Sequence, residues 1–255
     1  MTVTDGKITL GAKNEENLNF WCIWDNFRLS YLGTGNPDDE ELVAPEGWDN
    51  MIANGNLAGD NVSSFVSKEA PSADIVGSTI EMAAGKNYSR GIVVKSQDKV
   101  EVAWESQFWI KLSEALPAGS KLHVEFDYKA DNGGSVGTQA HGEPGNYQHW
   151  AAIGNVNFTP EWQHFSADIE VSSDMATANG GNGLLSIAFN LNDIAKADTF
   201  YFDNFGVWAQ KPVNVGIMTV EAGEKGEGIF NLSGQKVTNP TKGLYIINGK
   251  KVLVK

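Results

Sequence analysis

The feature that most constrains the fold is the regular succession of short apolar stretches and turn sequences between residues 51 and 210. Within each stretch large apolar residues alternate with polar ones, which is the period of a half-buried β-strand, and helical spacing is absent from the pattern. Turn signals such as Asp131-Asn132-Gly133-Gly134 and Asn179-Gly180-Gly181-Asn182-Gly183 separate the stretches. The sequence therefore predicts an all-β fold, an antiparallel jelly-roll β-sandwich with a small C-terminal β-unit.

The expected strands have one core face and one outer face, because successive side chains of a strand point to opposite sides. We expect strands at residues 62–68, 74–83, 90–96, 101–112, 121–129, 135–141, 147–153, 162–171, 184–191 and 199–208. The apolar sets Phe108/Ile110/Leu112 and Leu122/Val124/Phe126/Tyr128 mark two of the core faces. Function is then expected on the residues between them.

The last expected strand, Phe200–Trp208, carries the sequence Asp203-Asn204-Phe205 between aromatic residues. A similar pattern, Trp24-Asp25-Asn26-Phe27, lies near the start of the chain. Two copies predict two related β-domains, each ending on such a strand, with only the closing strands of the first one present.

These patterns divide the chain into four parts. Residues 1–33 are expected to be the closing hairpin of a truncated upstream β-domain, and residues 34–50, with their prolines and acidic residues, a linker. Residues 51–210 form the jelly-roll domain, and residues 211–255 the C-terminal β-unit. In that unit, residues 242–255 are expected to form a hairpin on the turn Asn248-Gly249.

The charge of the chain limits its partners. The formal net charge is −13, so a nucleic acid or another polyanion is disfavoured as ligand, and a neutral ligand fits better. No apolar run approaches the ~20 residues of a transmembrane helix. The single cysteine, Cys22, excludes an internal disulfide and is interpreted as a small buried apolar residue.

The outer-face residues indicate a sugar-binding site. Flat aromatic rings stack on the apolar face of a pyranose, and planar amides hydrogen-bond its hydroxyl groups. If the strands concerned are neighbours, they bring such side chains together. The candidate ligand-binding residues are Gln107, Trp109, Gln139, His141, Tyr147, Trp150 and Asn190.

A structural calcium ion is also expected. The loop Asn54–Asp60 opens the domain and Asp203 closes it, and the first and last strands of a sandwich often lie side by side. Oxygen ligands from both ends would attract a hard cation. The predicted ligands are Asn56, Asp60 and Asp203.

Two enzymatic alternatives remain open. The stretch Thr138-Gln139-Ala140-His141 looks like the Gln-x-His strand of jelly-roll alginate lyases, with Tyr147 as the base. The arginine-rich partner strand of those lyases is not evident. Glu125 and Asp127 could serve a glycoside hydrolase, which needs two carboxylates, although residues at this spacing on a strand often form a solvated face.

Residues 51–210 resemble the carbohydrate-binding modules of families four, nine, sixteen and twenty-two. The resemblance rests on Asn54-Gly55-Asn56-Leu57, on residues 121–129 and 161–165, and on the closing Tyr201-Phe202-Asp203-Asn204-Phe205. The segment Thr138–Gly145 looks like modules attached to xylanases. The resemblance implies non-catalytic binding of a neutral plant polysaccharide, xylan or β-glucan, by an ancillary module of a glycan-degrading protein, and it implies a structural calcium ion.

Residues 228–255 resemble a C-terminal sorting domain of the type IX secretion route. This resemblance implies export, to the medium or the outer cell surface. The implied partners are the polysaccharide, a catalytic domain of the same precursor, and the secretion machinery through the C-terminal tail. A third reading is a structural spacer that binds nothing.

Overall fold

The computed structural model describes residues 42–212 and 228–255. The expected closing hairpin at residues 1–33, with Cys22 and the first Asp-Asn-Phe sequence, lies outside the described residues. No helix in the described ranges is long and apolar enough to cross a membrane.

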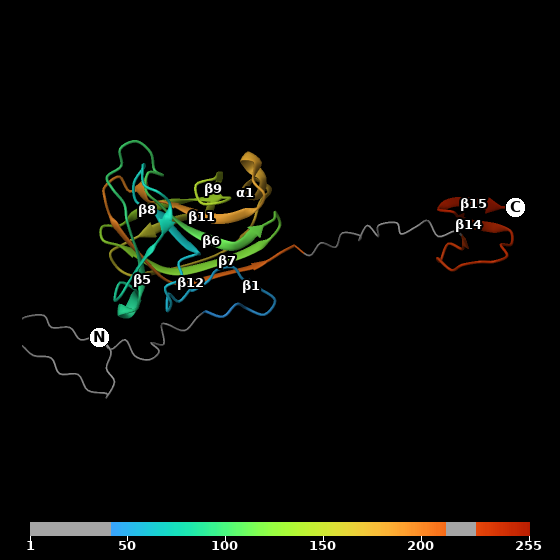
Figure 1. Ribbon diagram of the computed structural model, residues 1–255, viewed down its shortest axis with the longest axis horizontal. Helices are drawn as coiled ribbons and strands as arrows, with labels where there is room; N and C mark the ends of the chain where they lie inside the picture. Colours follow the sequence, from blue (N-terminus) through green and yellow to red (C-terminus); the bar gives the residue numbers. More distant parts are fainter. Residues whose placement is uncertain (1–41, 213–227) are drawn as a thin grey trace, which may run out of the picture.

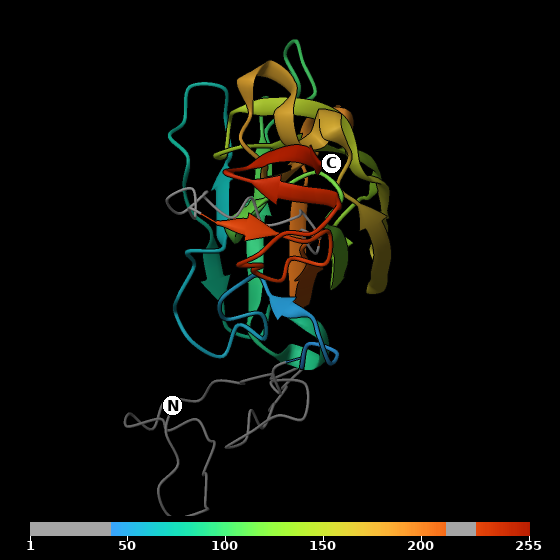
Figure 2. The same ribbon diagram turned by 90° about the vertical axis from the view of Figure 1, so that its right-hand side faces the viewer.

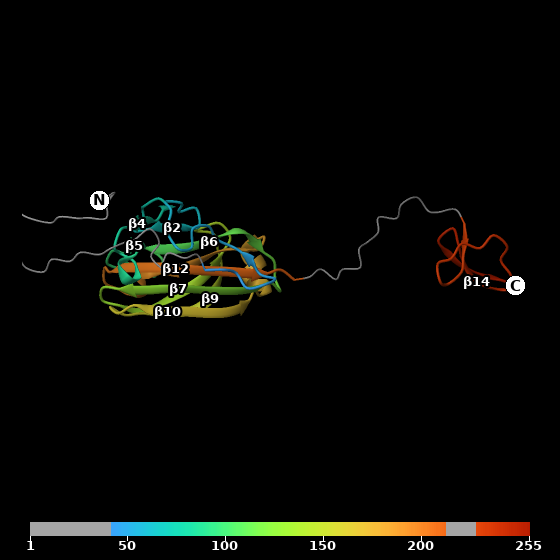
Figure 3. The same cartoon turned by 90° about the horizontal axis from the view of Figure 1, so that it is seen from below.

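Residues 49–210 fold into a jelly-roll sandwich of two antiparallel sheets, as predicted. In Figure 1 the layer with β6, β8, β9 and β11 lies above the layer with β1, β5, β7 and β12. The strand order is β10-β7-β12-β5-β4 in one sheet, where β1 also pairs with β12, and β3-β2-β6-β11-β8-β9 in the other. Figure 3 shows β10, β7, β12 and β5 side by side.

The elements of the sandwich have the following bounds: β1 Asp49–Asn50, β2 Phe65–Lys68, β3 Val76–Gly77, β4 Thr79–Glu81, η2 Lys86–Tyr88, β5 Gly91–Lys95, β6 Gln107–Leu116, β7 Lys121–Ala130, β8 Gly134–His141, β9 Tyr147–Phe158, β10 Gln163–Glu170, α1 Ser173–Thr177, η3 Ala178–Gly180, β11 Leu184–Asn190, η4 Leu191–Asp193 and β12 Thr199–Gln210. The expected strand at 101–112 begins later, at Gln107, because a loop precedes it.

The core lies between the two sheets, where aromatic rings from both faces meet. Phe108 of β6 stacks on Phe202 of β12 with ring centroids 4.4 Å apart, and Phe126 of β7 meets Phe189 of β11 edge-on at 5.6 Å. All four side chains are fully buried. Truncating one such ring to alanine costs about 3–5 kcal/mol, so these contacts dominate the stability of the sandwich.

The closing strand β12 carries the Asp-Asn-Phe sequence at a β-bulge. Its pairing with β7 shifts between Asp203 and Gly206, and Asn204 has a φ of 48°, a conformation that asparagine tolerates well. The bulge turns Phe205 into the core, where its backbone N–H donates to Gly55 O at 2.8 Å. A Cβ on Gly55 would collide with the carbonyl of Phe205. The Asp-Asn-Phe sequence of β12 therefore connects the last strand of the domain to its first loop through the hydrogen bond to Gly55.

The C-terminal unit forms a small sheet of its own, in red in Figure 2. Its strands are β13 Ile229–Phe230, β14 Gly243–Ile247 and β15 Lys250–Val254 in the order β13-β14-β15. Asn248 and Gly249 have φ values of 49° and 75°, as a tight hairpin turn requires, and the expected hairpin is present.

Candidate functional site

The candidate site is a pocket of about 310 Å³ on the outer face of the β6-β11-β8-β9 sheet. We call it the aromatic pocket, and its lining residues are Trp104, Gln107, Gln139, His141, Gly145, Tyr147 and Trp150. Five of the seven predicted ligand-binding residues are in this set. The neighbouring strands bring them together, as the sequence argument required.

Cross-strand pairing sets the spacing within the pocket. Gln139 on β8 lies opposite Trp150 on β9, and His141 lies opposite Tyr147. Irregularities in this pairing at residues 137–141, with a φ of 59° at Ala151, bend the two strands at the pocket. The pairing therefore places a polar and an aromatic side chain beside each other twice.

Three aromatic rings form the accessible wall of the pocket. Trp104, Tyr147 and Trp150 are 44%, 37% and 50% exposed. Trp150 lies 5.9 Å from Trp104 and 5.7 Å from Tyr147 between ring centroids, with interplanar angles of 61° and 59°. Large rings left in water at the mouth of a pocket are ready to stack on a ligand.

Sequence reasoning missed Trp104, because residues 101–112 were expected to form a strand. The buried carboxylate of Glu105 instead folds the preceding residues into a loop by accepting hydrogen bonds from the N–H groups of Val100, Glu101 and Val102 at 2.7, 2.5 and 3.0 Å. These hydrogen bonds, that of Val100 first, outweigh burial and lower the pKa of Glu105. The sequence feature that could have indicated this loop is the acidic residue Glu105 just before the apolar start of β6.

Trp109 has a different position from the one expected. Trp109 lies on the outer face of β6 and is not part of the core between the two sheets. Its indole is nevertheless fully buried and does not line the aromatic pocket. Its Nε1 donates a hydrogen bond to Nδ1 of His141 at 3.2 Å. Trp109 therefore supports the pocket from below, and the role of an exposed stacking ring passes to Trp104.

His141 is held as a neutral ring. Because Nδ1 accepts from Trp109, the proton of the neutral ring is on Nε2, which donates to Oε1 of Gln139 at 2.9 Å. Burial lowers the pKa of His141 to about 4. With its oxygen engaged by His141, Gln139 offers amide N–H groups to a ligand.

Asn190 lies behind the pocket and not in its wall. It is fully buried, and its Oδ1 accepts from Nε2 of Gln107 at 2.9 Å. The two residues are cross-strand partners on β11 and β6. Asn190 thus orients Gln107, which lines the pocket.

The lining of the aromatic pocket is uncharged. It contains no Asp, Glu, Lys or Arg side chain among the residues that the structure describes, and its histidine is neutral near pH 7. Exposed rings combined with fixed amides suit a neutral ligand that has both apolar faces and hydroxyl groups. The pocket supplies binding groups rather than a charged catalytic pair.

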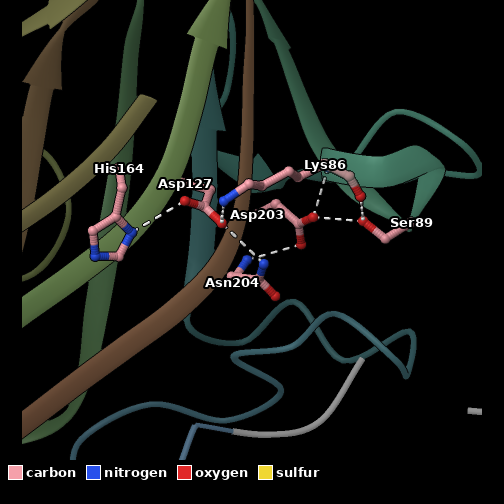
Figure 4. A network of polar contacts seen from close by, with 6 residues as sticks. All are labelled: Lys86, Ser89, Asp127, His164, Asp203 and Asn204. Atoms are coloured by element: carbon pink, nitrogen blue, oxygen red, sulfur yellow. Dashed lines mark hydrogen bonds and ion pairs between the residues drawn. The ribbon is translucent and has the colours of Figure 1, made fainter. Parts of the chain in front are cut away.

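Of the predicted calcium ligands, Asp203 lies at the bulge of β12. The strand that pairs with β12 from the start of the domain is β1, within the expected linker, whereas the first expected strand, at 62–68, is β2 in the other sheet. Asp203 is fully buried and accepts hydrogen bonds from Lys86 N at 2.8 Å, Ser89 Oγ at 2.5 Å and Asn204 N at 2.8 Å. Figure 4 shows this network, in which the neighbouring Asp127 contacts the Lys86 ammonium at 3.0 Å. Burial raises the pKa of Asp203 to about 6, despite these donors.

The other two predicted ligands have local partners. Asp60 forms an ion pair with Arg90, and Oδ1 of Asn56 accepts from the N–H of Ala58 at 3.3 Å. The loop of Asn56 touches the closing strand through the hydrogen bond from Phe205 to Gly55. The first loop therefore contacts the closing strand, but within the described ranges no group of three or more His, Cys, Asp or Glu side chains is placed to hold a metal.

The carboxylates of the hydrolase alternative lie on the other sheet. Glu125 and Asp127 belong to β7, whereas the aromatic pocket lies on the sheet with β8 and β9. Glu125 contacts His123 at 3.1 Å, and Asp127 contacts His164 at 3.1 Å besides Lys86. Both carboxylates thus have partners away from the pocket.

Comparison with known proteins gives structural similarity only. No family model and no curated protein matches the sequence. Among solved structures, a CBM4 module has a TM-score of 0.44 at 14% identity over 59% of this chain and 97% of that chain. The N-terminal cellulose-binding domain of Cellulomonas fimi β-1,4-glucanase C has a TM-score of 0.38 at 13% identity, over 58% and 90%. A family 29 carbohydrate-binding module has a TM-score of 0.35 at 14% identity, over 66% and 81%. These values are too low to assign a ligand to this chain.

Proposed function

We propose that the protein binds a neutral polysaccharide without catalysis, at the aromatic pocket. The observation that carries the proposal is the contact between three exposed rings, Trp104, Tyr147 and Trp150, around an uncharged floor of amides and a neutral histidine. The rings would cover apolar sugar faces, and Gln107 and Gln139 would hydrogen-bond hydroxyl groups. The ligand is xylan or a β-glucan.

An open pocket leaves much of a bound sugar in water, so the affinity should be modest, roughly micromolar to millimolar. Calorimetry of the full chain with soluble xylan, mixed-linkage glucan, mannan and alginate tests the proposal. We expect binding to xylan or glucan and none to alginate, because the net charge of −13 repels a polyanion. Absence of binding to every neutral glycan would refute the proposal and favour the spacer.

One observation favours a second candidate function. The residues of the lyase alternative, Gln139, His141 and Tyr147, are together in the pocket, and the rings of His141 and Tyr147 are 6.1 Å apart. A lyase would also need cationic groups for uronate carboxylates, and the pocket lining has none among the described residues. Ultraviolet absorbance of unsaturated products, measured with alginate, separates the two functions. Turnover of alginate would establish a lyase, whereas binding of xylan or glucan with no turnover of alginate would support the binding module.

We also propose that the protein is exported, as an ancillary module of a larger glycan-degrading precursor. The support is the separate, locally basic β-unit of residues 228–255, which resembles a sorting domain. Fusing residues 211–255 to a reporter in a bacterium with a type IX secretion route tests this. Surface or medium location of the reporter is expected, and cytoplasmic retention would argue against it.

A structural calcium ion bound by Asn56, Asp60 and Asp203 is the remaining proposal. Its support is the buried carboxylate of Asp203 with its raised pKa, next to a loop from the start of the domain. To include Asp60, the ion would have to replace its ion pair with Arg90. Its role would be to stabilise the fold.

A further inference from the structure

A second hollow adjoins the aromatic pocket. We call it the loop pocket; its volume is about 750 Å³, and it lies between the turn after β8 and the glycine-rich loop before β11. Figure 1 shows α1, which leads into this loop, beside β9. Gly145 and Tyr147 line both hollows. The two spaces are therefore neighbours that share Tyr147 as a wall.

Hydrogen bonds to β9 hold the shape of the loop pocket. Nδ2 of Asn179 donates to the carbonyls of Tyr147 and Gln148 at 3.3 and 3.4 Å, and Nε2 of Gln148 donates to Gly183 O at 3.2 Å. A Cβ on Gly181 would collide with the Gln148 side chain. The glycines leave the space open, and the hydrogen bonds preform it before any ligand arrives.

The lining has the chemistry of a polyol site. Asn146 and Asn182 expose their amides, and the carboxylate of Glu143 is paired with Lys111 at 2.7 Å. Gln148 is only 5% exposed, and its Oε1 has no hydrogen-bond partner within the described ranges. A buried acceptor at the wall of a hollow calls for a donor from a ligand hydroxyl or an ordered water.

We propose that the loop pocket is a second sugar subsite, so that an oligosaccharide lies across Tyr147 with sugars in both hollows. The inference rests on the proposed glycan binding. It adds the place where the oligosaccharide continues beyond the aromatic pocket. A neutral sugar fits, because the lining offers amides and one already paired carboxylate. The affinity should therefore grow with the length of the oligosaccharide beyond what the aromatic pocket alone can hold.

The test compares trisaccharides and hexasaccharides of the xylose and cellulose series by calorimetry on the full chain. The double variant Asn146→Ala/Asn182→Ala removes two exposed residues that line the loop pocket. Asn157→Ala, which removes an exposed amide near the other end of β9 and outside the pocket lining, is the control. We expect the double variant to lose about five- to tenfold in hexasaccharide affinity while trisaccharide affinity stays within about twofold. The control should match the parent.

The outcomes separate the two proposals. If the parent binds no oligosaccharide, the proposed function fails and this inference with it. If the parent binds and the double variant binds hexasaccharide equally well, or loses both ligands equally while folded by circular dichroism, the second subsite is refuted. Nuclear magnetic resonance adds a direct readout: the side-chain amide signals of Gln148 should shift with hexasaccharide and not with trisaccharide. Unshifted signals would also refute the subsite.

Discussion

The indole Nε1 of Trp109 donates a hydrogen bond to Nδ1 of His141, 3.2 Å away beneath the aromatic pocket. Indole can only donate, so this bond fixes which nitrogen of His141 carries the proton. The proton on Nε2 then holds the oxygen of Gln139 at 2.9 Å. A buried ring thereby determines which hydrogen-bonding groups the pocket offers.

Trp109→Phe should weaken both the fold and the site. Phenylalanine keeps an aromatic ring but leaves Nδ1 of His141 buried without its donor, which costs about 1–3 kcal/mol in the free energy of unfolding. Urea unfolding and calorimetry with the bound glycan check this. Trp162→Phe, on the side of the molecule where Lys129 lies over the Trp162 ring, is the matched control, and equal losses in both variants would contradict the proposed link.

Trp104→Ala and Trp150→Ala should each abolish most of the glycan affinity. One stacked ring in a weak site accounts for about 2 kcal/mol, or roughly thirtyfold in Kd. Both side chains are about half exposed, so the melting temperature should change little. Calorimetry of each variant, after a check of the fold by circular dichroism, measures the effect. Two folded variants that bind like the parent would place the site elsewhere.

Glu105→Gln should loosen the loop that carries Trp104. The amide lacks the charge that strengthens the three hydrogen bonds from residues 100–102, so we expect a lower free energy of unfolding and weaker glycan binding. Because the folded-state pKa of Glu105 is lowered, its contribution is present above the unfolded pKa and is lost as the pH falls through the folded value. Glu101→Gln, an exposed neighbour, should show neither effect in urea unfolding and calorimetry.

The pKa values of His123 and His141 should differ from the usual histidine value in opposite directions. Burial alone would lower the pKa of His123, but hydrogen bonds to Asp168 and Glu125 outweigh it and raise that pKa. Its stabilising contribution is therefore present below the unfolded pKa and is lost as the pH rises through the folded one. His141, with a pKa of about 4, stabilises the fold above about pH 6.5, and this stability is lost as the pH falls toward 4.

Nuclear magnetic resonance titration of the His123 and His141 rings checks both directions of shift. Because His141 stays neutral near pH 7, glycan binding should be flat between about pH 6 and 8. A bell-shaped dependence in this range would show that a titrating group acts on the ligand.

Removing calcium should lower the melting temperature, because an ion that binds only the native state stabilises it. The comparison is a thermal melt of the full chain with calcium and with a chelator. Asp203→Asn, which removes one charge from the buried network, should respond less to chelator than the parent. If the parent has the same melting temperature with calcium and with chelator, and elemental analysis finds no metal, the proposed calcium site is refuted.

The fold was largely predictable from the sequence, because the alternation of apolar and polar residues is local information. Phe108 and Ile110 are two residues apart on one strand, so both had to face the core, and both are fully buried. Asn248-Gly249 likewise specified its hairpin through two residues that adopt positive φ easily. The Asp-Asn-Phe sequence marked the closing strand. Asn204 lies at its β-bulge with a positive φ, which asparagine adopts more easily than most residues.

The candidate site was predictable only in part. Alternation placed Gln139 and His141 on one face. Tyr147 and Trp150 are three residues apart, and they reach the same face only because the pairing of β8 with β9 shifts between Ala140 and His141. Alternation also placed Trp109 on that face, but whether a ring on an outer face is exposed depends on what covers it. Likewise the Glu105 carboxylate holds residues 100–102 in a loop through hydrogen bonds from three backbone N–H groups. The alternation of apolar and polar residues does not predict such bonds.

The sequence by itself determined the two-sheet architecture and the residue types available for binding, since side-chain period and turn chemistry act over a few residues. The tertiary structure decided that Trp104 is exposed and Trp109 buried, and that the loop at residues 179–183 forms a second hollow beside Tyr147. These outcomes depend on contacts between segments far apart in the chain, as in the bond from Asn179 to the carbonyl of Tyr147. Burial and pairing of that kind arise only when the sheets and loops pack together.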